Sequence, residues 1–245
     1  NFTLDTISPV APVLVLNTDT GFSSIDAITN NATVSVTAEQ GASVLVVFTN
    51  TNTGYTEQVA VTGNGVVPVA AALSSTQLAL LGNGLISVTA IATDVAGNLG
   101  ATSAALTFEL DTIAPSIPVV ELVSDTGFNT SDGITRDGRV SVTAEVGTSV
   151  VVTFVNADTA IEVIYTLIGS GVAEVVSLNA AQLSTLGNGP ISVTAVAVDA
   201  AGNVSDPSAE LHFDLDTVVV PFEVSLAVDA GVSTTDGVTN DATVR

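Results

Sequence analysis

Hydrophobic and polar residues alternate at every second position along most of this chain. Residues 34–38, Val-Ser-Val-Thr-Ala, are one such run, and residues 85–93 place Ile, Val and Ala on one face and Ser and Thr on the other. A period of two puts successive side chains on opposite faces of an extended strand, so these runs predict half-buried β-strands. Seven such runs, bounded by Gly, Asn and Asp, lie near 13–17, 34–38, 44–49, 55–61, 66–72, 85–93 and 104–110.

One segment has a helical pattern instead. Residues 73–82, between the fifth and sixth predicted strands, place Leu at helical spacing, and Ser74 with Gln77 fits a capping box. Gly82 stands where a helix would end. The pattern returns at residues 178–187. It predicts a helix of one or two turns that crosses between two sheets.

The whole block of strands repeats. Leu110-Asp111-Thr112 has near-copies at residues 4–6 and 215–217, so the period is 106 and then 105 positions. Seven short strands in about 105 residues predict an all-β chain of tandem immunoglobulin-like β-sandwiches, each with one short helix between strands five and six. We expect the end of a preceding unit at 1–6, repeat 1 at 7–112, repeat 2 at 113–217 and a truncated start of repeat 3 at 218–245.

Composition excludes several classes of function. The chain has 25 acidic residues, 3 Lys or Arg and a formal net charge of −22, which argues against nucleic acids and anionic membranes as partners. It has no Cys, and no apolar run is long enough for membrane insertion. Gly-x-Ser-x-Gly is absent, and the single His, His212, is predicted on the outward face of a strand, so we expect no enzyme.

The acidic residues recur in five columns at the repeat period. One column lies in the joints between units, two lie in the loop between the first two strands, one lies in the hairpin before the last strand, and one follows the second strand. In that order the columns are Asp5, Asp111 and Asp216; Asp19, Asp125 and Asp229; Asp26, Asp132 and Asp236; Asp94 and Asp199; and Glu39 and Glu145. The hairpin also carries Asn98 and Asn203.

Immunoglobulin topology predicts that these columns meet at the joints. Asp19, Asp26 and Asp111 fall at one pole of repeat 1, and Glu145 and Asp199 fall at the facing pole of repeat 2. Two carboxylates about 5 Å apart repel by roughly 3 kcal/mol at an effective dielectric of 20, and the chain has too few cations to neutralise five. Calcium takes about six to eight hard oxygen ligands of this kind, whereas zinc would require His or Cys. We therefore predict Ca²⁺ sites at the joints, with the five columns, Asn98 and Asn203 as ligands.

A purely local role is the alternative for several of these residues. The sequences Asp-Thr-Gly at 19–21 and Asp-Val-Ala-Gly-Asn at 94–98 also favour tight turns. Asp111 suits this alternative least, because a strand end before a Pro-bearing linker needs no Asx-turn.

These motifs, in this order, resemble the bacterial immunoglobulin-like (Bap-like) extender repeats of giant Gram-negative repeats-in-toxin and biofilm adhesins. The similar elements are Leu-Asp-Thr-x-x-Pro, Asp-Thr-Gly-x(4)-Asp-x-Ile-Thr, Ala-Glu-x-Gly-x-x-Val and Asp-x-Ala-Gly-Asn-x-x-x-x-Ser, and they cover both complete units. The sequence departs from the pattern at Val219-Val220-Pro221 and at Asp229-Ala230-Gly231.

The resemblance implies a structural extender, or spacer, segment of a large adhesin at the bacterial cell surface, exported by type I secretion. Calcium would then bridge neighbouring repeats of the same chain into a monomeric rod. The alternative is a ligand-binding adhesive module that recognises carbohydrate, ice or another cell surface. Such a module would need an aromatic platform or a flat Thr array, and aromatic residues make up 4% of the chain.

Overall fold

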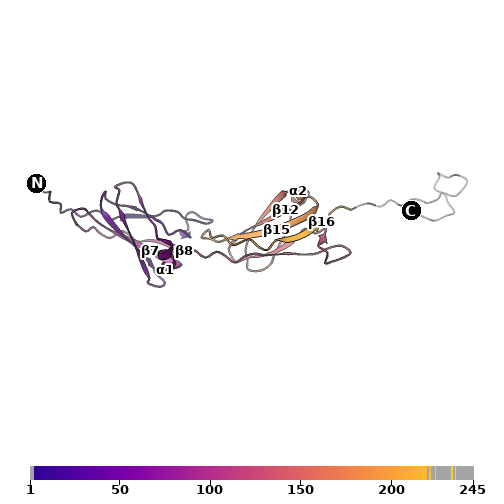
Figure 1. The fold of residues 1–245 in the computed structure, drawn as a ribbon, viewed down its shortest axis with the longest axis horizontal. Helices are drawn as coiled ribbons and strands as arrows, with labels where there is room; N and C mark the ends of the chain where they lie inside the picture. Colours follow the sequence, from indigo (N-terminus) through magenta and orange to yellow (C-terminus); the bar gives the residue numbers. More distant parts are fainter. Residues whose placement is uncertain (1–2, 220, 222–223, 225–232, 234, 236–245) are drawn as a thin grey trace.

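A computed structural model of the chain describes residues 3–219, 221, 224, 233 and 235. These residues form two β-sandwiches that lie end to end along the long axis of the molecule (Figure 1). Repeat 1 contains β1 (Val13–Leu16), β2 (Ile28–Thr29), β3 (Val34–Thr37), β4 (Ser43–Asn50), β5 (Thr56–Thr62), β6 (Val69–Ala71), α1 (Ser75–Leu81), β7 (Gly84–Thr93) and β8 (Leu106–Leu110). Repeat 2 contains β9 (Val119–Leu122), β10 (Ile134–Thr135), β11 (Val140–Thr143), β12 (Ser149–Asn156), β13 (Ile161–Ile168), β14 (Glu174–Val176), α2 (Ala180–Leu186), β15 (Gly189–Val198) and β16 (Leu211–Leu215).

Each sandwich pairs a three-stranded sheet with a five-stranded sheet. The order is β1-β3-β6 and β2-β8-β7-β4-β5 in repeat 1, and the equivalent strands of repeat 2 have the same order. All pairings are antiparallel except those of β2 with β8 and β10 with β16. This arrangement confirms the predicted fold class of tandem immunoglobulin-like sandwiches.

The core of each sandwich follows from the alternation in the sequence. In β4, Val44, Val46 and Phe48 are fully buried between the sheets, while the residues between them are more exposed. The equivalent residues of β12 are Val150, Val152 and Phe154, which are also fully buried. Burial of a side chain of this size contributes about 1.5–3 kcal/mol, so these rows supply much of the stability of each repeat.

Both predicted helices are present. The side chain of Ser74 accepts a hydrogen bond from Gln77 N at the start of α1, and Gln77 Oε1 accepts one from Ser74 N in return. Asn179 and Gln182 form the same capping box at the start of α2. Gly82 follows α1 with a φ of 69°, a conformation that glycine adopts without strain.

Strands β2 and β10 were not predicted from the sequence. Each has only two residues, which is too short for a period of two to be recognised. Each pairs with the last strand of its sandwich, as Ile28 does with Glu109. The pairing continues to the residue that leaves the sandwich, because Asp111 N donates to the carbonyl oxygen of Thr29. The exact limits of the four predicted units stay a prediction.

A buried asparagine at the end of β4 was also missed. Asn50 Nδ2 donates to the carbonyl oxygens of Leu81 at 3.0 Å and Asn83 at 3.0 Å, which closes the carboxyl end of α1 onto β4. Its Oδ1 accepts from the amides of Asn52 and Thr53 in the following turn. Asn156 has the same role in repeat 2, where it contacts Leu186 and Asn188.

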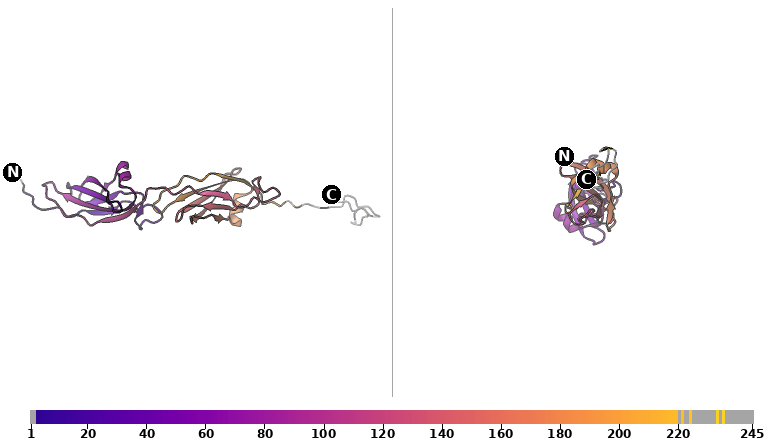
Figure 2. Two further views of the ribbon diagram at one scale, coloured as in Figure 1. Left: turned by 90° about the horizontal axis from the view of Figure 1, so that it is seen from below. Right: turned by 90° about the vertical axis from the view of Figure 1, so that its right-hand side faces the viewer.

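Viewed along the long axis, the two sandwiches overlap (Figure 2), so the chain leaves one repeat almost in line with the next.

Candidate metal centre

The two acids of the loop before β2 differ in their surroundings. Asp19 Oδ2 accepts a hydrogen bond from Ala27 N at 3.0 Å, whereas its Oδ1 is buried with no hydrogen-bond partner among the described residues. Asp125 repeats this arrangement, with Gly133 N at 2.9 Å from Oδ2 and a buried, unpaired Oδ1. Asp26 and Asp132 are exposed and accept from the amide two residues on.

Burial of a carboxylate oxygen without a partner costs free energy, and a hydrogen-bond donor or a bound cation would offset this cost. The same atom is left unpaired in both repeats, at the same position of the same loop. A hard divalent cation would satisfy it. Asp19 and Asp125 therefore fit the predicted calcium ligands best.

The joint acids form local turns that we did not expect. Asp111 Oδ1 accepts from Ile113 N at 3.0 Å and from Asn83 Nδ2 at 3.1 Å. Asp5 and Asp216 likewise accept from the amide two residues on. The argument that Asp111 needs no Asx-turn was wrong, because this turn orients the chain as it leaves β8 toward the prolines.

The hairpin acids also have local partners. Asp94 accepts from Asn98 N at 2.8 Å and from Asn98 Nδ2 at 2.7 Å, and Asp199 binds Asn203 in the same way. The side-chain hydrogen bond from Asn98 is the main cause that lowers the pKa of Asp94, followed among the lowering causes by backbone amides of the turn, while burial acts in the opposite direction. A lowered folded-state pKa stabilises the turn above the unfolded-state pKa, and this stabilisation is lost as the pH falls through the folded-state value.

The asparagines of these hairpins reach the joints. Asn203 Nδ2 donates to the backbone oxygen of Asp111 at 2.9 Å, and Asn98 Nδ2 donates to that of Asp5 at 3.2 Å. Both use their amide nitrogen in these contacts. Each hairpin is therefore fastened to the joint that precedes its own repeat.

The glutamates after β3 and β11 are both exposed. Glu145 Oε2 accepts from Ser116 N at 2.9 Å and so fastens the joint between Pro115 and Pro118, both of which are buried, to repeat 2. For Glu39 the structure gives no side-chain hydrogen bond within the described residues. Asp229 and Asp236 lie outside the residues that the structure describes.

The two poles meet at the joint, as the topology predicted. Thr20 Oγ1 donates to the carbonyl oxygen of Ala201 at 2.6 Å, which brings the loop of Asp19 against the hairpin of Asp199. Within the described part of the chain, however, no three His, Asp or Glu side chains are grouped so that they could hold a metal ion. The assignment of the acidic columns as calcium ligands stays a prediction.

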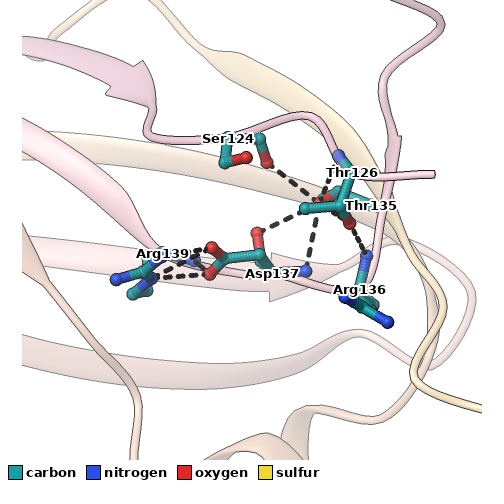
Figure 3. A network of polar contacts seen from close by, with 6 residues as sticks. All are labelled: Ser124, Thr126, Thr135, Arg136, Asp137 and Arg139. Atoms are coloured by element: carbon teal, nitrogen blue, oxygen red, sulfur yellow. Dashed lines mark hydrogen bonds and ion pairs between the residues drawn. The ribbon is translucent and has the colours of Figure 1, made fainter. Parts of the chain in front are cut away.

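Protein cations neutralise little of the acidic charge. Arg139 forms a bidentate ion pair with Asp137, with its Nε 2.8 Å from Oδ1 and its Nη2 2.6 Å from Oδ2 (Figure 3). The hydrogen bond from Arg139 is the main cause that lowers the pKa of Asp137. His212 lies on the outward face of β16 with 69% of its side chain exposed, 3.5 Å from Glu210.

The strand order and the doubled sandwich define the class of this chain as a tandem immunoglobulin-like protein. Residues 6–112, which span repeat 1, match the family described as the bacterial Ig-like domain. Repeat 2 has the same strands in the same sheet order. Among proteins of curated function, the comparison found none similar in sequence.

Several solved structures are similar to the chain at low identity. A tetra-tandem repeat in the extending region of a large adhesion protein is 21% identical with a TM-score of 0.36, over 85% of this chain and 50% of that one. A 1.5-MDa bacterial ice-binding adhesin is 18% identical with a TM-score of 0.35, over 89% and 69%. The chicken CNTN1 FN1–FN3 domains are 14% identical with a TM-score of 0.42, over 85% and 65%. This chain thus spans about half the length of the first of these structures, and similarities at this level assign it neither a ligand nor an activity.

Proposed function

We propose that this chain is a structural extender segment of a large adhesin on the bacterial cell surface, and that calcium bound at its joints stiffens the array of immunoglobulin-like repeats. The family match and the end-to-end arrangement of the sandwiches support the extender role. In the part of the chain that the structure describes, no helix is long and apolar enough to cross a membrane.

The observation that carries the calcium proposal is the buried, unpaired Oδ1 of Asp19 and of Asp125. Asp19 lies at the pole where repeat 1 meets repeat 2, in the loop that leads into β2, and Thr29 of β2 accepts a hydrogen bond from Asp111 N. Because the chain has a net charge of −22 and only 3 Lys or Arg, a bound divalent cation would neutralise carboxylates that the protein's own cations do not. With Asp19 and Asp111 as ligands, bound calcium would offset the desolvation of these carboxylates and hold the joint in one geometry.

Calcium is expected to stabilise the chain through Asp19 and Asp125. A ligand at 100 times its dissociation constant stabilises the folded state by about 2.7 kcal/mol, so melting in excess calcium should occur several degrees above melting in chelator. Asp19→Asn should abolish this gain for repeat 1. In chelator the same substitution should be neutral or stabilising, because it removes the charge of a carboxylate whose Oδ1 is buried without a partner.

Calorimetric titration with calcium, and melting followed by circular dichroism, measure both effects. The matched control is Glu162→Gln, which removes one charge from an exposed strand position of repeat 2. Equal losses in the two variants would mean general relief of charge repulsion instead of a site, and the proposal would then be wrong. The absence of any calcium-dependent change in melting would also contradict it.

Removal of the joint carboxylate is expected to loosen the joint. In calcium, Asp111→Ala should leave both sandwiches folded and broaden the distribution of interdomain angles, because a ligand and the hydrogen bonds to Asn83 and Ile113 are lost together. Small-angle scattering measures this distribution. Asp216→Ala removes the same Asx-turn beyond repeat 2 and serves as the control. An unchanged scattering profile for Asp111→Ala would count against a bridging role.

A further inference from the structure

Repeat 1 also contacts repeat 2 without using any acidic side chain. Thr20 Oγ1 donates to the carbonyl oxygen of Ala201 at 2.6 Å, and Asn30 N donates to the same oxygen at 3.3 Å. The Thr20 hydroxyl is held in place by Thr29 Oγ1, at 2.9 Å, and by Asn30 N, at 2.9 Å. Thr29 is fully buried, so it holds the Thr20 hydroxyl in a fixed position.

Two glycines allow this close approach. A Cβ atom on Gly21 would overlap the carbonyl oxygen of Ala200, and a Cβ atom on Gly202 would lie 2.9 Å from Gly21 N. Both residues also have positive φ, +98° and +90°. The backbone of the loop therefore packs directly on the backbone of the hairpin turn. We call the Thr-Gly step with its supporting Thr the socket, and residues 199–203 or 94–98 the turn.

Repeat 2 carries a second socket with the same internal hydrogen bonds. Thr126 Oγ1 lies 3.0 Å from Thr135 Oγ1 and accepts from Arg136 N at 2.9 Å, and Thr135 donates to Ser124 O at 3.0 Å (Figure 3). Thr135 is as fully buried as Thr29. The socket is thus formed before any partner docks on it.

Among the described residues, this second socket has open space where the first has a turn. A Cβ atom on Gly127 would meet nothing closer than Ile134 O at 3.9 Å. The next residue, Phe128, is fully exposed, whereas its equivalent Phe22 is 52% exposed. A pocket of about 430 Å³ opens here, lined by Thr126, Gly127, Ile134, Thr135, Arg136 and Asp216.

The turn of repeat 1 is the matching free half. Ala96 is exposed, whereas its equivalent Ala201 is 1% exposed under the socket of repeat 1. A Cβ atom on Gly97 would meet nothing within 4 Å, in contrast to Gly202. Each repeat therefore carries a turn at one pole and a socket at the other, and only the pair at the central joint is engaged within the described residues.

We propose that the Thr-Gly socket is the docking site for the Asp-x-Ala-Gly-Asn turn of the following repeat, and that this contact sets the orientation of neighbouring repeats without a metal ion. The occupant of the Thr126–Gly127 socket is then the equivalent turn of a further repeat of the same kind. The contact of Thr20 with Ala201 is itself part of the interface between repeats 1 and 2. The docking proposal is independent of the calcium proposal.

Residual dipolar couplings of the full chain in chelator test the docking. The two repeats should share one alignment tensor in the wild-type chain. Thr20→Val removes the hydroxyl and Gly21→Ala adds the overlapping Cβ, so each should cause loss of the common tensor while the amide spectrum within each repeat is retained.

Thr126→Val and Gly127→Ala are the matched controls in the same chain. They alter the equivalent loop of repeat 2, and Gly127→Ala also places alanine at a positive φ. Because no turn docks on this socket within the described chain, the common tensor should persist. Separate tensors in the wild-type chain would overturn the proposal, as would a common tensor in both Thr20→Val and Gly21→Ala. Loss of the tensor in the controls would overturn it too, because the effect would then come from the loop alone. Calcium is absent throughout, so failure of the calcium proposal would not affect this result.

A lengthened chain tests the second socket. When a further copy of residues 113–217 is fused after Thr217, the added turn should dock on Thr126 and Gly127. Thr126→Val and Gly127→Ala should then uncouple the added repeat from repeat 2, although they have no such effect in the original chain. If these substitutions left the added repeat coupled to repeat 2 in the lengthened chain, the assignment of this occupant would be overturned.

Discussion

Replacement of Phe154 by alanine is expected to destabilise repeat 2 by about 3–5 kcal/mol. Phe154 is fully buried in β12, where it pairs with Val163 of β13 and Val193 of β15. Its removal leaves a cavity between the sheets that the neighbouring valines are too short to fill. Because repeat 1 has a separate core, it should keep its own stability.

Hydrogen exchange, measured separately for the amides of repeat 1 and of repeat 2, tests this prediction. Amides of β12 and β15 should exchange faster in Phe154→Ala, while those of β4 and β7 should be unchanged. Phe128→Ala is the control, because Phe128 is fully exposed in the same repeat. If Phe154→Ala destabilised both repeats equally, the two sandwiches would not be independent folding units.

Asn50→Ala is expected to destabilise repeat 1 by about 3 kcal/mol. Asn50 is 1% exposed, and its side chain satisfies backbone groups at the end of α1 and in the turn after β4. Alanine would leave these buried groups without partners, which costs more than the loss of one hydrogen bond. It would also remove the hydrogen bonds that join the end of the helix to β4, the strand that carries the fully buried Phe48.

Chemical denaturation of the full chain, followed by hydrogen exchange in each repeat, measures this loss. Asn64→Ala, at an exposed asparagine of the same repeat, should have little effect. Asn156→Ala should produce the same loss in repeat 2, because its contacts are the same. A loss below 1 kcal/mol in both Asn50→Ala and Asn156→Ala would mean that water replaces the asparagine at these sites.

The alternation of side chains predicted most of the fold because each long strand buries one face. The capping box at Ser74 and Gln77 predicted α1, since this signal needs only residues three apart. Strands β2 and β10 lacked any such signal, because two residues do not define a period. Asn50 was missed because its partners at the end of α1 lie more than 30 positions away along the sequence.

The candidate site was predictable in outline and not in detail. Sandwich topology predicted correctly that the loop of Asp19 meets the turn of Asp199. The contacts of Thr20 and Gly21 with the turn of repeat 2 were not predicted, because Thr and Gly after Asp are already explained as turn formers. The pairing of Asp94 with Asn98, and of Asp111 with Ile113, depends on side-chain rotamers that the sequence does not specify.

The two ends of each repeat are unlike, since one presents a hydroxyl and a bare backbone and the other presents a carbonyl. A contact between unlike ends is head-to-tail, and it continues in one direction without closing on itself. A gene segment that encodes one such unit can therefore be duplicated or deleted by recombination without leaving a mismatched end inside the protein. The length of such an array then depends on copy number alone, and it can evolve without any change in the amino acids at the joints.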